Sequence, residues 1–209
     1  MNNPRRVLAS VAAAAALAIC ATVLAGGAKI PEGFKEISGD RFIVDLRYDT
    51  DDNFLHKNVY VKYGIDRCWL HPEAASRLIE LEPKLRKEHL KLVLWDCYRP
   101  NAVQKEMWKI VPDEHFVANP KKGSMHNRGL AVDITLADEN GKRLLMPSSF
   151  DDFSDHASPN YRCAPAEKSL CRNRDRLINL MHSVGFEEFP TEWWHYSPHG
   201  LDVNNYPVR

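Results

Sequence analysis

Residues 124–133 contain side chains that could bind a metal ion. The segment reads Ser-Met-His-Asn-Arg-Gly-Leu-Ala-Val-Asp, so His126 and Asp133 are separated by a short stretch with two small residues, Gly129 and Ala131. Imidazole and carboxylate groups are good ligands for a cation such as zinc. Small residues are typical of places where the backbone passes close to another group. Taken alone, this spacing favours a surface loop followed by a half-buried strand.

A second stretch near the C-terminus supplies what the first one lacks. Glu192-Trp-Trp-His195 adds a second histidine, and two histidines with one aspartate leave one position open, as in catalytic zinc sites. Glu192 lies three residues before this ligand, where a carboxylate can serve as general base. On a straight strand the two side chains would point to opposite faces. We therefore expect a bulge or turn between them, or Glu192 on the preceding loop.

The elements that must position these residues are strands and helices without strict alternation, which predicts a single α+β domain. Apolar, β-branched runs predict the strands, and apolar residues at helical spacing predict the helices. The expected strands are residues 42–46, 59–61, 92–95 and 131–136, with 142–145 pairing back as a hairpin. The expected helices begin at residues 72, 100 and 166, and Pro83 should divide the first of them.

Arg99 lies at a predicted junction between a strand and a helix. It follows the apolar run 92–95 and precedes Pro100, which suits the first turn of a helix. Such junctions often carry functional side chains on a fixed scaffold. A surface arginine that caps a loop is the alternative.

The charged residues exclude one class of partner. The sequence has 28 Lys+Arg and 28 Asp+Glu, a formal net charge of zero, and no long run of either sign. A nucleic-acid-binding protein would present a basic face or stripe. The sequence therefore predicts a mixed-charge surface and no nucleic-acid partner.

Residues 1–25 have the layout of a secretory signal peptide. Two arginines precede an alanine-rich apolar run at residues 7–24, and the small residues that follow suit cleavage after residue 25, or as late as residue 28. Cleavage would leave one domain, residues 29–209, in the periplasm or secreted, with no stable membrane insertion. A retained N-terminal membrane anchor is the alternative, because the apolar run is nearly long enough to span a bilayer.

The cysteines agree with export. Apart from Cys20 in the apolar run, the sequence has Cys68, Cys97, Cys163 and Cys171, which permit two disulfides in three connectivities. Cys163 and Cys171 are close in sequence and are expected to pair, which leaves Cys68 with Cys97. Four free, buried thiols are the alternative.

Together these motifs resemble the zinc D-alanyl-D-alanine peptidase superfamily, through Ser-x-His-x-x-Gly-x-Ala-x-Asp at 124–133 and Glu-x-x-His at 192–195. Within it, the chain is similar to the D-alanyl-D-alanine dipeptidase family, which includes the vancomycin-resistance dipeptidase. The segments that carry this similarity are Asp45-Leu-Arg-Tyr48, Asp52-Asn-Phe54, Trp95-Asp-Cys-Tyr-Arg-Pro100, Phe150-Asp151 and Glu192-Trp-Trp-His-Tyr196. The stretch between Arg99 and Ser124 is shorter than in the resistance-type enzymes.

The resemblance implies a mostly antiparallel central sheet flanked by helices, as in hedgehog and D-Ala-D-Ala peptidase-like folds. It also implies one zinc ion per chain, held by His126, Asp133 and His195, with Glu192 as catalytic base and acid.

The remaining implied roles concern the substrate. Arg99 would stabilise the oxyanion, a task suited to a permanently charged planar donor. Asp151 would receive the free amino group of the substrate, while Tyr48 and Ser124 would line its site. The implied reaction is the hydrolysis of the small dipeptide D-Ala-D-Ala to two D-alanines.

Two alternatives remain at this point. A D,D-carboxypeptidase or endopeptidase acting on peptidoglycan stem peptides would need an open groove, whereas a pocket closed by the loop around Asp151 favours a dipeptide. A non-catalytic metal-binding module would need neither Glu192 nor Arg99. The sequence leaves the oligomeric state open.

Overall fold

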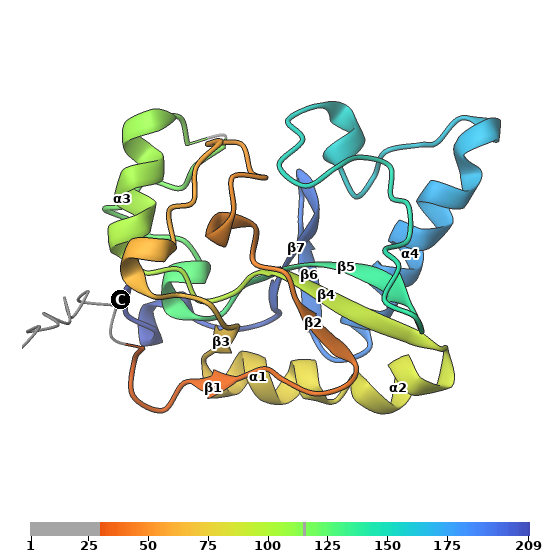
Figure 1. Ribbon diagram of the computed structural model, residues 1–209, viewed down its shortest axis with the longest axis horizontal. Coiled ribbons are helices and arrows are strands. Elements are labelled where there is room, and N and C mark those ends of the chain that lie inside the picture. The colour runs from red at the N-terminus through yellow and green to blue at the C-terminus, as the bar shows by residue number, and fades with distance from the viewer. Residues whose placement is uncertain (1–29, 115) are drawn as a thin grey trace, which may run out of the picture.

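A computed structural model describes residues 30–114 and 116–209 (Figure 1). The expected signal peptide and Cys20 lie outside these residues. Within the described part of the chain, no helix is both long and apolar enough to cross a membrane.

A five-stranded sheet forms the centre of the molecule. Its strand order is β2 (Phe42–Val44), β4 (Leu90–Asp96), β5 (Val132–Asp138), β7 (Glu192–Pro198) and β6 (Phe186–Phe189). β2 runs parallel to β4, and the three other neighbouring pairs are antiparallel. The prediction of an α+β domain with a mostly antiparallel sheet is therefore confirmed.

Among the described residues, four α-helices pack around the sheet, together with a small two-stranded sheet of β1 (Lys35–Glu36) and β3 (Trp69–Leu70). Figure 1 shows α1 and α2 along one side of the central sheet, while the loops after β2 (orange) and after β5 (teal) rise on the opposite side. These loops carry several of the residues described below. The helices are α1 (Pro72–Ile79), α2 (Glu82–Lys87), α3 (Asn101–Ile110) and α4 (Lys168–His182).

The first predicted helix is divided as expected. Pro83 lies in the first turn of α2, where its missing N–H and fixed φ are tolerated, and α1 has already ended at Ile79. The start of α1 is capped by the His71 ring, which accepts a hydrogen bond from the Glu73 backbone N–H at 3.2 Å. Pro72 follows this cap at the first helical position.

β4 is the central strand that the continuous apolar run predicts. Six of its seven residues are buried, and it pairs with β2 on one side and β5 on the other. In the pairing with β5, Leu92 faces Leu136 and Leu94 faces Ile134, all four fully buried. Burial on both faces explains why this strand is apolar without alternation.

Two expected strands do not form. The prediction for residues 59–61 is wrong, because the Asn58 side chain accepts hydrogen bonds from the backbone N–H groups of Tyr60 and Val61 and turns the chain into a 3₁₀ helix, Val61–Tyr63. Such local side-chain bonds compete with strand pairing. The hairpin expected at residues 142–145 is reduced to one isolated bridge, between Ala137 and Arg143.

Candidate active site

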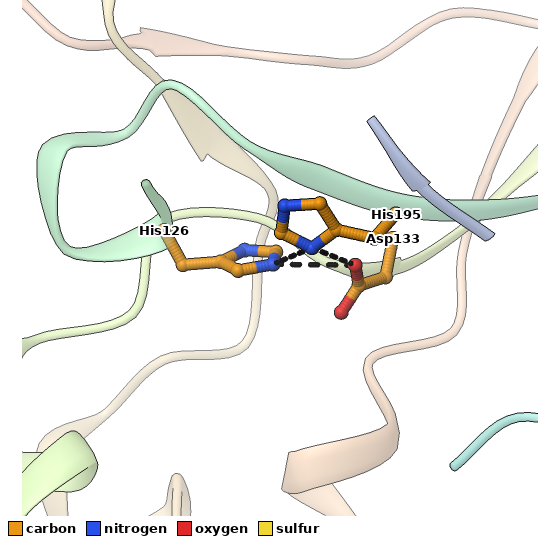
Figure 2. A group of neighbouring side chains, drawn as sticks. All are labelled: His126, Asp133 and His195. Atoms are coloured by element: carbon orange, nitrogen blue, oxygen red, sulfur yellow. Dashed lines mark hydrogen bonds and ion pairs between the residues drawn. The ribbon is translucent and has the colours of Figure 1, made fainter. Parts of the chain in front are cut away.

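Three side chains from different parts of the chain converge at the centre of the sheet. Asp133 on β5 and His195 on β7 are direct partners in the strand register, and His126 comes from a 3₁₀ turn just before β5. Asp133 Oδ1 lies 3.0 Å from His195 Nδ1 and 3.2 Å from His126 Nε2, and the two nitrogens are 3.1 Å apart (Figure 2). The structure thus brings the predicted ligands together.

The turn that carries His126 is fixed from several sides. The Ser124 hydroxyl accepts a hydrogen bond from the His126 backbone N–H at 3.2 Å, and Cys97 O accepts one from His126 Nδ1 at 2.8 Å. Gly129 ends the turn with φ +67°, and a Cβ there would lie 2.3 Å from the Phe34 ring. The prediction that a small residue is needed for close approach is confirmed at this position.

The donor set fits a divalent cation. With Nδ1–H of His126 donating to the Cys97 carbonyl, its Nε2 lone pair faces the cluster, next to a carboxylate oxygen and a second imidazole nitrogen. Atoms bound at 2.0–2.2 Å to one zinc ion lie about 3.3 Å from one another in tetrahedral geometry, close to the distances observed. Three converging acceptors would repel one another without a cation or protons between them.

The electrostatics of the cluster point the same way. Burial alone would raise the pKa of Asp133, but the neighbouring His126 and His195 rings hold it well below the ordinary value. Burial would lower the pKa of His126, yet the carboxylates of Asp133 and Asp96 raise it. The site therefore keeps its aspartate ionised and attracts positive charge to the imidazole.

Glu192 lies beside the triad because β7 is irregular. Phe189 pairs with Glu192 and Glu188 with Tyr196, so three residues of β7, 193–195, bulge out opposite no residue of β6. Glu192 Oε2 consequently lies 3.8 Å from His195 Nδ1. The bulge expected between these two side chains is present. Burial raises the pKa of Glu192 to about 7, near the optimum for a group that accepts and returns protons around neutral pH.

Arg99 is held in the same pocket by Asp96, a residue to which the sequence reasoning assigned no role. Its Nε donates to Asp96 Oδ2 at 2.8 Å, Nη2 donates to the same oxygen, and Nη1 donates to Gln104 Oε1 at 3.0 Å. Nη2 also lies 4.0 Å from Asp133 Oδ2. Asp96 is fully buried and also accepts a hydrogen bond from the Tyr60 hydroxyl. An acidic residue that ends a continuous apolar strand is the sequence signal that could have identified it.

Asp151 forms another charged group of the pocket. Its carboxylate accepts hydrogen bonds from the Tyr48 hydroxyl at 3.2 Å and from the Phe54 backbone N–H at 3.1 Å. Burial raises the pKa of Asp151 to about 7, although the Phe54 N–H favours the ionised form. The backbone of Asp151 is left-handed, with φ +56°, so the loop presents this side chain at some conformational cost.

All eight residues that the sequence singled out for catalysis, metal or substrate line one cavity of about 280 Å³. Aromatic residues that the sequence reasoning did not single out as site residues complete its wall. Phe116 and Phe153 are in contact, with ring centroids 4.6 Å apart, and Phe153 continues to Phe54 at 5.6 Å. These three rings come from different loops, so no local motif could have identified them. The eight residues are Tyr48, Arg99, Ser124, His126, Asp133, Asp151, Glu192 and His195.

Several known proteins have sequences similar to this chain. A family model described as D-ala-D-ala dipeptidase matches residues 33–207. The D-alanyl-D-alanine dipeptidase of Escherichia coli is 34% identical over 153 residues, covering 73% of this chain and 77% of that protein. The D-alanyl-D-alanine dipeptidase of Enterococcus faecium is 32% identical over 191 residues, covering 79% and 92%.

One solved structure, a vancomycin resistance D,D-pentapeptidase in complex with Zn(II), has 18% identity and a TM-score of 0.41, covering 68% of this chain and 79% of that one. That similarity is too low to carry an argument. The family match spans nearly all of the described residues and includes the whole cavity. The chain belongs to the D-ala-D-ala dipeptidase family of peptidases.

Proposed function

We propose that this protein is a zinc-dependent dipeptidase that hydrolyses D-Ala-D-Ala to two D-alanines. The observation that carries the proposal is one small cavity that contains the triad, a raised-pKa carboxylate beside it, a buried arginine and a separate carboxylate, Asp151. The D-alanyl-D-alanine dipeptidases of E. coli and Enterococcus faecium support the choice of substrate.

His126, Asp133 and His195 would hold the metal. Zinc bound there would supply Lewis-acid chemistry, which activates water and polarises a peptide carbonyl. Glu192, 3.8 Å from His195, would take the proton from the attacking water and return it to the leaving amine. Burial raises the pKa of Glu192 above its ordinary value, which favours return of the proton to the leaving amine.

Arg99 would act on the carbonyl oxygen of the scissile bond, and Asp151 on the free amino group of the dipeptide. The negative charge that develops on the carbonyl oxygen needs a preorganised cation, and Asp96 fixes the Arg99 guanidinium before substrate enters. A dipeptide also carries an ammonium group next to the scissile bond. The Asp151 carboxylate, held by Tyr48 and Phe54, can pair with that ammonium.

The dimensions of the cavity favour a dipeptide over a stem peptide. Its volume of about 280 Å³ lies just below the range of roughly 300–1,000 Å³ that is typical of sites for drug-sized ligands. The contact between Phe116 and Phe153 joins two loops at its wall. A stem peptide would also lack, at Asp151, the free ammonium that this carboxylate can pair with.

The direct test is to incubate zinc-loaded protein with D-Ala-D-Ala, L-Ala-L-Ala and a peptidoglycan pentapeptide that ends in D-Ala-D-Ala. We expect release of D-alanine from the D,D-dipeptide, and a kcat/KM at least 100-fold lower for the other two. Comparable hydrolysis of the pentapeptide would favour a D,D-carboxypeptidase instead. No hydrolysis of any of them by zinc-loaded protein would favour a non-catalytic metal-binding module.

We also propose that the protein acts outside the cytoplasm. The support is the signal-peptide pattern of residues 1–25 together with two disulfide bonds, which persist in oxidising compartments. An exported dipeptidase would recover D-alanine from wall fragments rather than deplete the cytoplasmic D-Ala-D-Ala pool. Cell fractionation with N-terminal sequencing tests this. Uncleaved protein in the membrane fraction would indicate the retained anchor, and uncleaved protein in the cytosol would refute export.

A further inference from the structure

Cys97 lies between the two halves of the candidate active site. Its carbonyl oxygen accepts the hydrogen bond from His126 Nδ1, at 2.8 Å, and its backbone N–H donates to Asp96 Oδ1, also at 2.8 Å. Asp96 in turn holds Arg99. One residue therefore orients both a ligand of the proposed metal and the carboxylate that fixes the arginine.

We propose that the Cys68–Cys97 disulfide is a positioning element of the metal site, so that the metal affinity of the protein depends on whether this bond is formed. The inference rests on the metal site of the proposed function. It concerns how His126 is held, and it assigns no contact between sulfur and metal.

The segment that contains Cys97 has no regular secondary structure. β4 ends at Asp96 and α3 begins at Asn101, so residues 97–100 belong to no strand or helix. One backbone hydrogen bond, from Tyr98 N–H to Trp69 O at 2.9 Å, ties the segment to β3. The disulfide ties it covalently to Cys68, the residue immediately before β3.

Cys68 is itself a fixed anchor. Its carbonyl oxygen accepts a hydrogen bond from the Ile37 backbone N–H at 2.8 Å, and both cysteines are buried, with exposed fractions of 0% and 1%. The Arg99 backbone N–H donates to His126 O at 3.1 Å, and the Asn127 side chain donates to Arg99 O at 2.8 Å. With the bond from His126 Nδ1 to Cys97 O, three hydrogen bonds join the segment to the His126 turn. Movement of this segment would therefore turn the His126 ring away from the orientation that points Nε2 at Asp133.

The second disulfide provides a matched control. Cys163 and Cys171 join the loop before α4 to the first turn of that helix, and the Cys171 sulfur contacts the Cys163 backbone N–H and the Tyr161 carbonyl oxygen. Neither residue lines the active-site cavity. A general loss of a covalent link should affect stability through both bonds, whereas an effect on metal affinity should follow only Cys68–Cys97.

Loss of a group that orients a metal-bound histidine typically weakens metal binding by about 10- to 100-fold. Coupling between two equilibria is reciprocal, so bound zinc should make the Cys68–Cys97 bond harder to reduce by the same factor. Reduction by a dithiol transfers two electrons and two protons to the bond, yields two thiols, and converts the dithiol to its disulfide. A tenfold effect corresponds to about 30 mV in the reduction potential of this two-electron couple.

The test compares Cys68→Ser/Cys97→Ser with Cys163→Ser/Cys171→Ser in the otherwise complete protein. Zinc affinity is measured by competition with a chromophoric chelator at pH 7.5, and circular dichroism checks the fold. We expect affinity to fall at least tenfold in the first variant and to stay within twofold of wild type in the second. If the first variant bound zinc as tightly as wild type, or if both variants lost affinity equally, the Cys68–Cys97 bond would have no specific effect on the metal site.

A second measurement covers the case in which the first variant does not fold. The Cys163→Ser/Cys171→Ser protein retains only the Cys68–Cys97 bond outside the N-terminal segment, and it can be equilibrated with dithiol buffers with and without zinc. We expect the reduction potential to be more negative with zinc by about 30 mV or more. An unchanged potential would overturn the inference. A wild-type protein that binds no zinc would instead overturn the proposed function, and the two failures are thus distinguishable.

Discussion

Substitution of Asp151 by asparagine should stabilise the substrate-free protein, and the gain should depend on pH. Burial raises the folded-state pKa of Asp151 to about 7, whereas the ordinary value is 3.8. Between these two pH values the folded state keeps a proton that the unfolded state has released. The contribution of Asp151 to wild-type stability must therefore fall as pH rises from about 4 to 7 and level off above it. Asparagine does not titrate. With its one carbonyl oxygen in the position of Oδ2, it can still accept hydrogen bonds from the Phe54 backbone N–H and the Tyr48 hydroxyl, which lie 3.1 Å and 3.4 Å from that oxygen.

The magnitude follows from the pKa difference. An increase from 3.8 to about 7 is roughly three pH units, which corresponds to an upper limit of about 4 kcal/mol. Asp151 is only partly buried and borders a solvent-accessible cavity, so screening reduces this, and we expect about 2 kcal/mol. For a domain of this size, that gain raises Tm by about 4–8 °C.

Thermal unfolding followed by circular dichroism at pH 5, 6, 7 and 8 measures this effect. The protein should be kept in a chelator, because a cation at Asp133 would compensate one of the negative charges that raise the pKa of Asp151. We expect the Tm difference between variant and wild type to be small at pH 5 and largest at pH 8. Asp51→Asn, an exposed carboxylate outside the active-site cavity, is the control. A Tm difference independent of pH, or an equal one in the control, would refute the reasoning.

Three further predictions concern catalysis. Glu192→Gln should leave zinc binding unchanged and lower kcat on D-Ala-D-Ala at least 100-fold, because an amide cannot accept the proton; activity within tenfold of wild type would remove Glu192 from the base role. Arg99→Lys should lower kcat/KM by about 100- to 1,000-fold, because lysine cannot keep both donors on Asp96 and a charge at the oxyanion; the exposed Arg143→Lys is the control, and a similar loss in both would contradict it. Phe153→Ala should raise the kcat/KM ratio of D-Ala-D-Ala-D-Ala to D-Ala-D-Ala severalfold, because the ring helps to close the cavity wall; Leu145→Ala, also exposed but outside this cavity, should leave the ratio unchanged.

Local patterns predicted most of the regular elements. The apolar run of β4, the proline-defined starts of α2 and α3 and the amphipathic α4 depend on interactions within a few residues, and sequence spacing records such interactions directly. The predicted strand at residues 59–61 failed for the same reason. Asn58 offered the backbone a local hydrogen-bond partner, and that bond outweighed the β propensity of Val59, Tyr60 and Val61.

The residue types also predicted the chemistry of the site. His126, Asp133 and His195 have side chains that can bind a metal ion. Strand geometry alone predicted a bulge or turn before His195, or Glu192 on the preceding loop, and the structure has the bulge. Their convergence was not contained in the sequence spacing. It depends on the register that pairs Asp133 with His195 across two strands separated by about sixty residues of chain.

The surroundings of those ligands required the tertiary structure. Burial of Glu192 and Asp151, which raises both pKa values to about 7, results from loops that close over the sheet. Asp96 accepts hydrogen bonds from Arg99, and Phe116 contacts Phe153. No local sequence pattern specifies the directions of these side chains. The sequence determined which atoms could do the chemistry, because residue type sets charge and ligand character. Packing decided their pKa values, orientation and enclosure, because these depend on the desolvation and contacts that only the folded chain creates.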